Sequence, residues 1–284
     1  MSVPGNRVAA AVRSSVIAVD FSALRGKPVR RLTLDGLDTV RIRHPADVRA
    51  AAIALRDMAA DMQLRVACTH DLAERDTPVD DAGNVLARDV FGWGDGEKVW
   101  WRNRRIALQS PIATACRVET EAFWVNAQGF RTLTPNPYLT GIDLEDFEAR
   151  SLTRAALVVP VHLTFGRIGV VSFIPMDEKR TDLSDAFAEQ ADTLAAYART
   201  FLMSYSKVMS GLQLVPMGVQ LSKREVECLR WAALGKTDLE IGLIISRAWA
   251  TVRFHIQNAS HKLNAVNRCQ TLFKAAQLGY ITMP

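Results

Sequence analysis

The sequence predicts an α/β body, an α-β-α sandwich, followed by an all-α tail that forms a four-helix helix–turn–helix domain. Two observations favour this division. Residues 156–174 contain two apolar runs around the turn TFGR, which is typical of a β-hairpin, and helical patterns stand before and after it. After residue 220, short helical segments are separated by glycine and serine, and no strand pattern appears.

The body alternates helical and strand-like segments. The helix expected over residues 45–63 opens with Pro45 near its first turn, a position that tolerates proline. The long helix expected over residues 182–210 has an apolar stripe that we expect to pack on its own domain and on a second copy. The remaining expected elements are strands at 16–21, 64–68 and 84–93, helices at 97–117 and 143–156, and a strand or short helix at 121–126.

Composition excludes some classes of protein. With 284 residues, of which 49% are hydrophobic, two packed domains are the expectation. No apolar run approaches the roughly 20 residues of a membrane span, and the N-terminal VIAV is too short for a signal peptide, so a cytoplasmic location without membrane contact is expected. The four cysteines form no CxxC pair, which favours reduced thiols over a metal site or disulfide. No cofactor is expected.

Charge is concentrated in the tail. Residues 221–284 contain nine lysines and arginines against four acids, a net charge of +5 that equals the net charge of the whole chain. Residues 1–220 therefore balance to zero. A neutral body with a basic tail indicates that attraction to phosphate resides in the tail.

The helices of the tail have recognisable starts. Ser222 with Glu225, and Thr237 with Glu240, match the S/T-x-x-E capping box, and Gly235 ends the first helix. The exposed N–H groups at the start of the second helix, beside Lys236, suit a phosphate of double-stranded DNA. The third helix is expected to be capped by Ser246 and to run to Leu263.

A helical wheel of the third helix separates two faces. Val252, Ile256, Ala259 and Leu263 form a core stripe, and Ala250, Arg253, Phe254 and Gln257 lie opposite. Arginine and glutamine can pair with guanine and adenine in the major groove, and an apolar group can meet a thymine methyl. For Phe254, packing against another domain or subunit is the alternative, and His255 and His261 are expected to be structural or near phosphate. The predicted DNA-binding residues are Lys236, Thr237, Arg247, Trp249, Ala250, Thr251, Arg253, Phe254 and Gln257.

The tail closely resembles the DNA-binding domain of LuxR-type transcription regulators. The shared pattern is LSKRE, GKT, EIG, the run from Ser246 to His255, KL, NR and a closing GYI, over about 60 residues. The resemblance implies that Glu225 is structural and that Arg253 contacts DNA. Residues 248–250, Ala-Trp-Ala, depart from the usual small polar residues at these positions.

The body resembles, more weakly, the autoinducer-binding domain of quorum-sensing LuxR proteins, an architecture like that of GAF and PAS sensor domains. The resemblance rests on the hairpin and on the aromatic and SPIATACR segments before it. It implies a pocket for a small apolar signal molecule. The expected ligand-binding residues are Trp101, Arg105, Ser110, Phe123 and Trp124.

The pocket also departs from that family. Ser110-Pro111 stands where the family has Asp-Pro, so the charge-assisted bond to the amide of an acyl-homoserine lactone is lost. We expect a ligand whose polar end also accepts hydrogen bonds, such as a ketone, phenol, ester or carboxylate. Arg105 implies an acidic or carbonyl ligand group if it faces the pocket, and implies nothing if it faces solvent.

The sequence disfavours two other functions, a phosphoacceptor receiver and an enzyme. A phosphoacceptor receiver domain is disfavoured because Phe21 follows Asp20 and a helical pattern occupies residues 49–63, and none of the common catalytic motifs is found. A ligand-responsive dimeric regulator is favoured over one whose body only dimerises; RNA polymerase is left open as a further partner. The expected domains are an N-terminal extension (1–44), a ligand-sensing and dimerisation domain (45–210), a linker (211–220) and the DNA-binding domain (221–284).

Overall fold

The computed structural model describes residues 17–18, 33–73, 77–94, 108–209 and 219–282. The chain forms two compact units, an N-terminal α/β unit and a C-terminal helical unit. Each unit has a hydrophobic core of its own.

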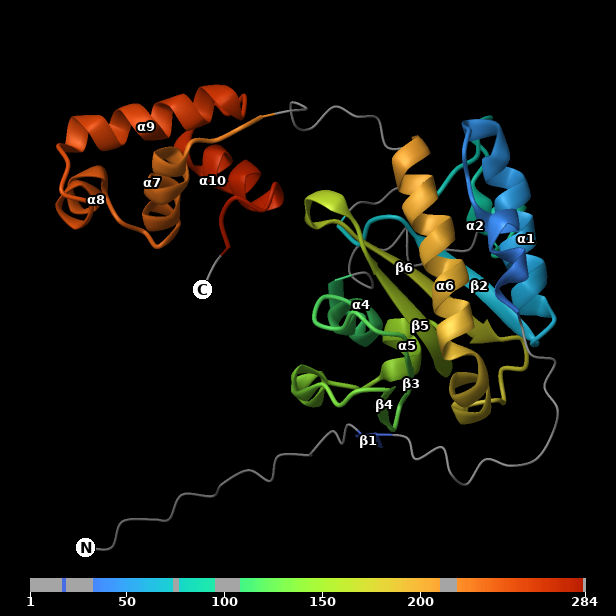
Figure 1. The fold of residues 1–284 in the computed structure, drawn as a ribbon. Coiled ribbons are helices and arrows are strands. Elements are labelled where there is room, and N and C mark those ends of the chain that lie inside the picture. Colours follow the sequence, from blue (N-terminus) through green and yellow to red (C-terminus); the bar gives the residue numbers. More distant parts are fainter. Residues whose placement is uncertain (1–16, 19–32, 74–76, 95–107, 210–218, 283–284) are drawn as a thin grey trace, which may run out of the picture. The chain divides into compact units, whose positions relative to one another are not determined.

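The N-terminal unit is built on one six-stranded sheet with the strand order β1-β4-β3-β5-β6-β2 (Figure 1). Neighbouring strands are antiparallel, except that β1 pairs with β4 in parallel. The strands are β1 (Ile17–Ala18), β2 (Leu64–Thr69), β3 (Phe123–Asn126), β4 (Gly129–Thr132), β5 (Ala155–His162) and β6 (Ile168–Pro175). The expected hairpin is therefore present as β5 and β6.

Helices cover both faces of this sheet. Figure 1 shows α1 and α6 on one face and α4 and α5 on the other. Along β5, Leu157 and Val159 pack into the core beneath α1 and α6, whereas Ala156 and Val158 pack into the core on the opposite face. The predicted α-β-α sandwich is confirmed. The helices of this unit are α1 (Val48–Ala60), α2 (Leu86–Asp89), α4 (Pro111–Ala115), α5 (Phe147–Ser151) and α6 (Ser184–Met209).

Residues just before α1 belong to the packed unit. A 3₁₀ helix, η2 (Leu34–Val40), contacts α6, and Val40 and Ile42 are buried in the core. The Ile42 N–H donates to Ser204 Oγ at 3.0 Å. A Cβ on Gly36 would come 2.4 Å from the Tyr197 hydroxyl, so a larger residue there would require the Tyr197 side chain to shift. Part of the segment expected to be an N-terminal extension is thus integral to the fold.

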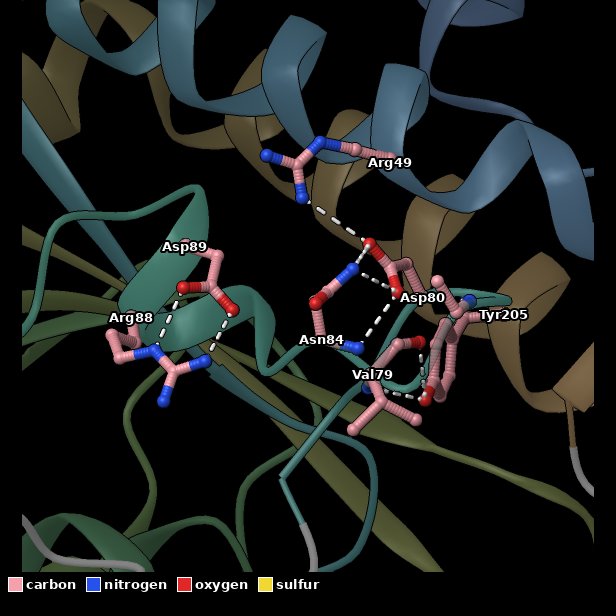
Figure 2. A network of polar contacts seen from close by, with 8 residues as sticks. Arg49, Val79, Asp80, Asn84, Arg88, Asp89 and Tyr205 are labelled. Carbon is pink, nitrogen blue, oxygen red and sulfur yellow. Dashed lines mark hydrogen bonds and ion pairs between the residues drawn. The ribbon is translucent and has the colours of Figure 1, made fainter.

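The loop between β2 and α2 is anchored by the polar network of Figure 2. Asp80 is buried and accepts hydrogen bonds from the Asn84 backbone N–H (2.8 Å) and from Arg49 Nη1 (3.2 Å) on α1. The Tyr205 hydroxyl on α6 accepts from the Val79 N–H (2.9 Å) and donates to the Val79 carbonyl (3.2 Å). The loop is therefore fixed to two helices at once.

Two expected elements of the body were wrong. Residues 84–93 contain α2 rather than a strand, since Leu86, Ala87, Val90 and Phe91 are buried with the spacing of a helix. The helix expected over 143–156 is limited to α5. Asp146 and Leu152 bound it with positive φ angles of 50° and 56°, and β5 then begins. Of the helix expected at 97–117, residues 97–107 lie outside the described residues and 111–115 form α4.

The C-terminal unit contains the four expected helices. They are α7 (Lys223–Ala233), α8 (Asp238–Ile244), α9 (Trp249–Lys262) and α10 (Arg268–Gln277). Both predicted capping boxes form: the Ser222 N–H donates to Glu225 Oε2 at 2.7 Å, and the Thr237 N–H donates to Glu240 Oε2 at 2.8 Å.

The turn between α8 and α9 differs from the prediction. Ser246 has a φ of 53° and does not cap α9, whose N-cap position is Ala248 with no side-chain hydrogen bond. The turn instead packs on α8, where the Arg247 N–H donates to the Gly242 carbonyl at 2.8 Å. A Cβ on Gly242 would lie 2.6 Å from the Arg247 carbonyl oxygen. Glycine at this position therefore permits the close approach of α9 to α8.

Candidate functional site

The two faces of α9 are arranged as the helical wheel predicts. Val252, Ile256 and Ala259 are buried in the core of the C-terminal unit, and Leu263 follows them at the C-terminal end of the helix. On the other face, Trp249, Ala250, Arg253, Phe254 and Gln257 are exposed. Phe254 is 57% exposed, so no described part of the chain covers it. An exposed aromatic and two side chains that are expected to read bases thus share one solvent-facing surface, which we call the α9 face.

Arg253 is held from two sides. Its guanidinium carbon lies 5.2 Å from the centre of the Trp249 ring, within the range of a cation–π contact. Its Nε lies 3.6 Å from Asp238 Oδ2 at the start of α8. Asp238 also forms an ion pair with Arg268, whose Nη2 donates to the Lys236 carbonyl at 2.8 Å. Residues of α8, α9 and α10 therefore orient the central arginine of the α9 face.

At the start of α8, some of the hydrogen-bond donors that could bind a phosphate are already bonded to Glu240 of the same helix. Glu240 accepts from the Thr237 N–H and from the Thr237 hydroxyl, both at 2.8 Å, and these bonds lower the pKa of Glu240 below its ordinary value. Lys236 Nζ lies 3.8 Å from Glu240. Thr237 thus serves as a cap, and Lys236 is partly neutralised.

The flank of α9 carries further positive charge. Arg247, in the turn before α9, is exposed, and its Nη1 donates to the Ser246 carbonyl at 3.1 Å. Thr251 is half-buried in the first turn of α9. Among the described residues, Arg247 bonds to the carbonyl of its own neighbour, Ser246, so its guanidinium can also contact phosphate oxygens.

Glu225 is a buried carboxylate of the C-terminal unit. It is 3% exposed and accepts from Lys262 Nζ at 2.8 Å and from the Ser222 N–H at 2.7 Å. Burial alone would raise the pKa of Glu225, but the Lys262 and Ser222 hydrogen bonds outweigh it and the pKa is lowered. The ion pair joins α7 to the end of α9. The motif pointed to Glu225 but not to its partner Lys262.

The N-terminal unit contains a cavity of about 1220 Å³ on the sheet face that α4 and α5 cover. Side chains of β2 and β6 form its floor, among them Arg65, Ala67, Val170, Ser172 and Ile174. Ile112 of α4 and Phe147 of α5 contribute to its walls. The cavity is slightly larger than the roughly 300–1,000 Å³ that is typical of small-molecule sites.

The expected ligand residues are only partly brought together. Trp101 and Arg105 lie outside the described residues. Ser110 borders the cavity, but its Oγ also caps α4 by accepting from the Ala113 N–H at 3.5 Å. Phe123 and Trp124 are adjacent in β3 and pack into the cores on opposite faces of the sheet, and neither borders the cavity. The expectation that both aromatics wall one pocket is therefore wrong.

Sequence patterns missed one polar group of the cavity. Ser172, on β6, is 9% exposed, and its hydroxyl has no hydrogen-bond partner in the described part of the chain. It stands opposite Ala67 on the sheet floor. Alternation along the hairpin strand is the signal that could have found it, because Val170, Ser172 and Ile174 share a face.

The described residues also bear on two other kinds of site, a metal site and a membrane span. Among them, no cluster of His, Cys, Asp and Glu side chains could hold a metal ion, and no helix is long and apolar enough to cross a bilayer. All four cysteines carry free thiols, three of them buried. Burial raises the pKa of the Cys68 thiol to about 12, so it is inert at neutral pH.

The fold and the α9 face define the C-terminal unit as a helix–turn–helix domain. Residues 219–275 match the family "Bacterial regulatory proteins, luxR family". The chain is 35% identical to the transcriptional activator VanR of Vibrio anguillarum over 128 residues, which are 45% of this chain and 52% of VanR. It is 55% identical to the quorum sensing-dependent transcriptional regulator VjbR of Brucella ovis over 64 residues, which are 22% of this chain and 25% of VjbR.

Among solved structures, Escherichia coli SdiA is similar, with a TM-score of 0.48 and 20% identity over 88% of this chain and 96% of that chain. The resemblance to LuxR-type regulators is confirmed by the family match over residues 219–275 and by the curated relatives. The matched curated relatives are regulators of transcription and not enzymes. The chain spans about half the length of the first curated relative that it matches.

Proposed function

We propose that this protein is a ligand-responsive, sequence-specific regulator of transcription that binds a palindromic promoter site as a dimer. The observation that carries the proposal is the α9 face, where Arg253, Phe254 and Gln257 project from a helix whose other side is buried in a luxR-family domain. A helix presented in this way enters the major groove in helix–turn–helix proteins.

Within this proposal, the predicted residues have different roles. Arg253 and Gln257 read base edges, and Ala250 and Phe254 meet thymine methyls. Lys236, Thr237, Arg247 and Thr251 contact phosphates and set the position of α9. Trp249 supports Arg253. Because the partner is promoter DNA, we place the protein in the cytoplasm, with RNA polymerase as a further partner of the DNA-bound dimer.

The mutation that tests the DNA interface is Arg253→Ala. It should weaken binding to the preferred site by about 1–3 kcal/mol and relax the preference at one base pair. Arg224→Ala is the matched control, because Arg224 is an exposed, ion-paired arginine of the same unit that lies on α7 and not on the α9 face. Fluorescence anisotropy with a set of single-base variants measures both effects. Unchanged affinity and preference in Arg253→Ala would show that α9 is not the reading helix.

The cavity favours ligand response over a body that only dimerises. About 1220 Å³ of space bordered by apolar side chains and an unpartnered serine is unusual for a purely structural domain. A ligand at 100 times its dissociation constant should stabilise the protein by about 2.7 kcal/mol, seen as a rise in melting temperature. If no small molecule from a broad set raises the melting temperature, the ligand-independent alternative is favoured.

Dimerisation is proposed through α6. This helix has 26 residues and is long for a domain of this size. The expectation that its apolar stripe also packs on a second copy is wrong, because Phe187, Leu194, Phe201 and Tyr205 are all buried in the core of their own unit. A second copy would use the exposed remainder of the helix. Light scattering at micromolar concentration with operator DNA present should give the mass of two chains. A single chain per DNA site would contradict this part of the proposal.

A further inference from the structure

The cavity of the N-terminal unit is bordered by four arginines in unlike surroundings. Three of them have carboxylate partners within 3.1 Å: the pairs are Arg150 with Asp143, Arg154 with Glu148, and Arg180 with Asp185. The fourth, Arg65, has no carboxylate partner in the part of the chain that the structure describes.

Arg65 is nevertheless held in place. Its guanidinium carbon lies 4.8 Å from the centre of the Trp93 ring. Trp93 is fixed in turn, because its indole N–H donates to the Val66 carbonyl of the edge strand β2 at 2.6 Å. Stacking on an aromatic ring leaves the N–H donors at the guanidinium edge available. Arg65 therefore presents a fixed cation at the border of the cavity.

The same side of the sheet offers a second polar contact and an apolar surface. Ser172 is 9% exposed, and its hydroxyl has no hydrogen-bond partner among the described residues, so it can donate to or accept from a ligand. Arg65 pairs with Ile174 in the sheet, two residues from Ser172 on β6. Ile112, Phe147 and Val170 border the cavity with apolar side chains.

We infer that this cavity takes an organic carboxylate with an apolar body. The carboxylate accepts hydrogen bonds from the Arg65 guanidinium, a fork that matches its two oxygens. The apolar body lies against Ile112, Phe147 and Val170, and a ligand oxygen pairs with Ser172. This inference rests on the proposed ligand response and specifies the chemical class of the ligand.

Within the described residues, none of the acids that border the cavity forms an ion pair with Arg65. Asp177 borders the same cavity just beyond β6, but its Oδ1 accepts from the Lys179 N–H at 2.9 Å, which holds it in its own turn. Among the described arginines that border the cavity, Arg65 is thus the one with which an incoming anion can pair without breaking an existing ion pair.

The test compares two probes of equal chain length, decanoate and decan-1-ol, by isothermal titration calorimetry on the full chain. Decanoate should bind the unmodified protein about tenfold more tightly than decanol, a difference of about 1.4 kcal/mol. Arg65→Met should abolish this preference while decanol binding is retained. Arg65→Lys, which keeps the charge but not the planar fork, should restore part of it. Arg154→Met is the matched control and should keep the full preference.

The outcomes separate this inference from the proposed function. If decanol binds as tightly as decanoate, or if Arg65→Met keeps the preference, the carboxylate inference is wrong. If a neutral probe such as decanol or a decanoyl-homoserine lactone binds and decanoate does not, the ligand response stands and only this inference fails. If none of the three probes binds, both fail for ligands of this size.

Discussion

The Arg253 guanidinium lies over the Trp249 ring, 5.2 Å from its centre and one turn further along α9. Trp249 is 50% exposed, so its ring supports the arginine at the surface and not in the core. The side chain expected to read a base is therefore held in position before DNA arrives, which reduces the ordering that binding requires.

This contact predicts coupling between the two residues. Trp249→Ala should weaken specific DNA binding by about 0.5–1 kcal/mol, the range of an exposed cation–π contact. In an Arg253→Ala background the same mutation should have little effect, because the guanidinium it supports is gone. A double-mutant cycle with the preferred duplex, followed by anisotropy, measures the coupling. Additive losses would mean that Trp249 contacts DNA independently.

Asp238 predicts a change in specificity. Asp238→Asn removes the carboxylate that pairs with both Arg253 and Arg268. Affinity for unrelated DNA should rise, since one negative charge near the phosphates is lost, and the preference for the specific site should fall because Arg253 is less constrained. The ratio of the two affinities at fixed salt is the measurement. Asp143→Asn, in the N-terminal unit, is the control and should leave that ratio unchanged.

Gly242 predicts a loss of stability. A Cβ there would lie 2.6 Å from the Arg247 carbonyl oxygen, which belongs to backbone that cannot easily move. Gly242→Ala should therefore destabilise the C-terminal unit by about 1–3 kcal/mol. The neighbouring Leu243 side chain is 76% exposed, and Leu243→Ala should stay within about 0.5 kcal/mol of the unmodified protein. Calorimetric melting of both variants checks the contrast.

Glu225 predicts a pH-dependent stability. Its pKa is lowered in the folded state, so its contribution is fully present above the unfolded value of about 4.3 and is lost as the pH falls through the folded value. Glu225→Gln should destabilise the C-terminal unit at pH 7 by about 1.5–3 kcal/mol, the range for hydrogen bonds to charged groups.

The difference between Glu225→Gln and the unmodified protein should shrink below pH 4, where the carboxyl of the unmodified protein becomes protonated. Melting temperatures across pH 3–7 test this. A difference that does not change with pH would show that the Lys262 ion pair contributes nothing and that only packing was altered.

Local patterns were enough to predict the C-terminal unit. The capping boxes of α7 and α8 and the core stripe of α9 depend on residues three or four positions apart, and all are present. The start of α9 was missed because it depends on the backbone contact between Gly242 and Arg247. The ion pairs of Asp238 were not predicted, because its partners Arg253 and Arg268 lie far from Asp238 in the sequence.

The body was harder to predict for the same reason. The cavity floor joins β2 to β6, whose side chains meet only through sheet pairing. The sequence of residues 121–126 fits either a strand or a short helix. Because the segment forms the strand β3, its period of two places Phe123 and Trp124 on opposite faces of the sheet. The two misassigned segments, 84–93 and 143–156, instead depend on local features, namely the helical spacing in α2 and the positive φ angles that bound α5.

The central claim is that two copies place α9 in successive major grooves. A hydroxyl-radical and methylation-interference footprint of the full chain on a duplex selected from a random library tests it most directly. The account predicts two symmetric major-groove contacts about 34 Å apart, on one face of the duplex, with the contact at one base pair of each half-site lost in Arg253→Ala. A single protected patch, or a two-fold footprint that Arg253→Ala leaves unchanged, would contradict it.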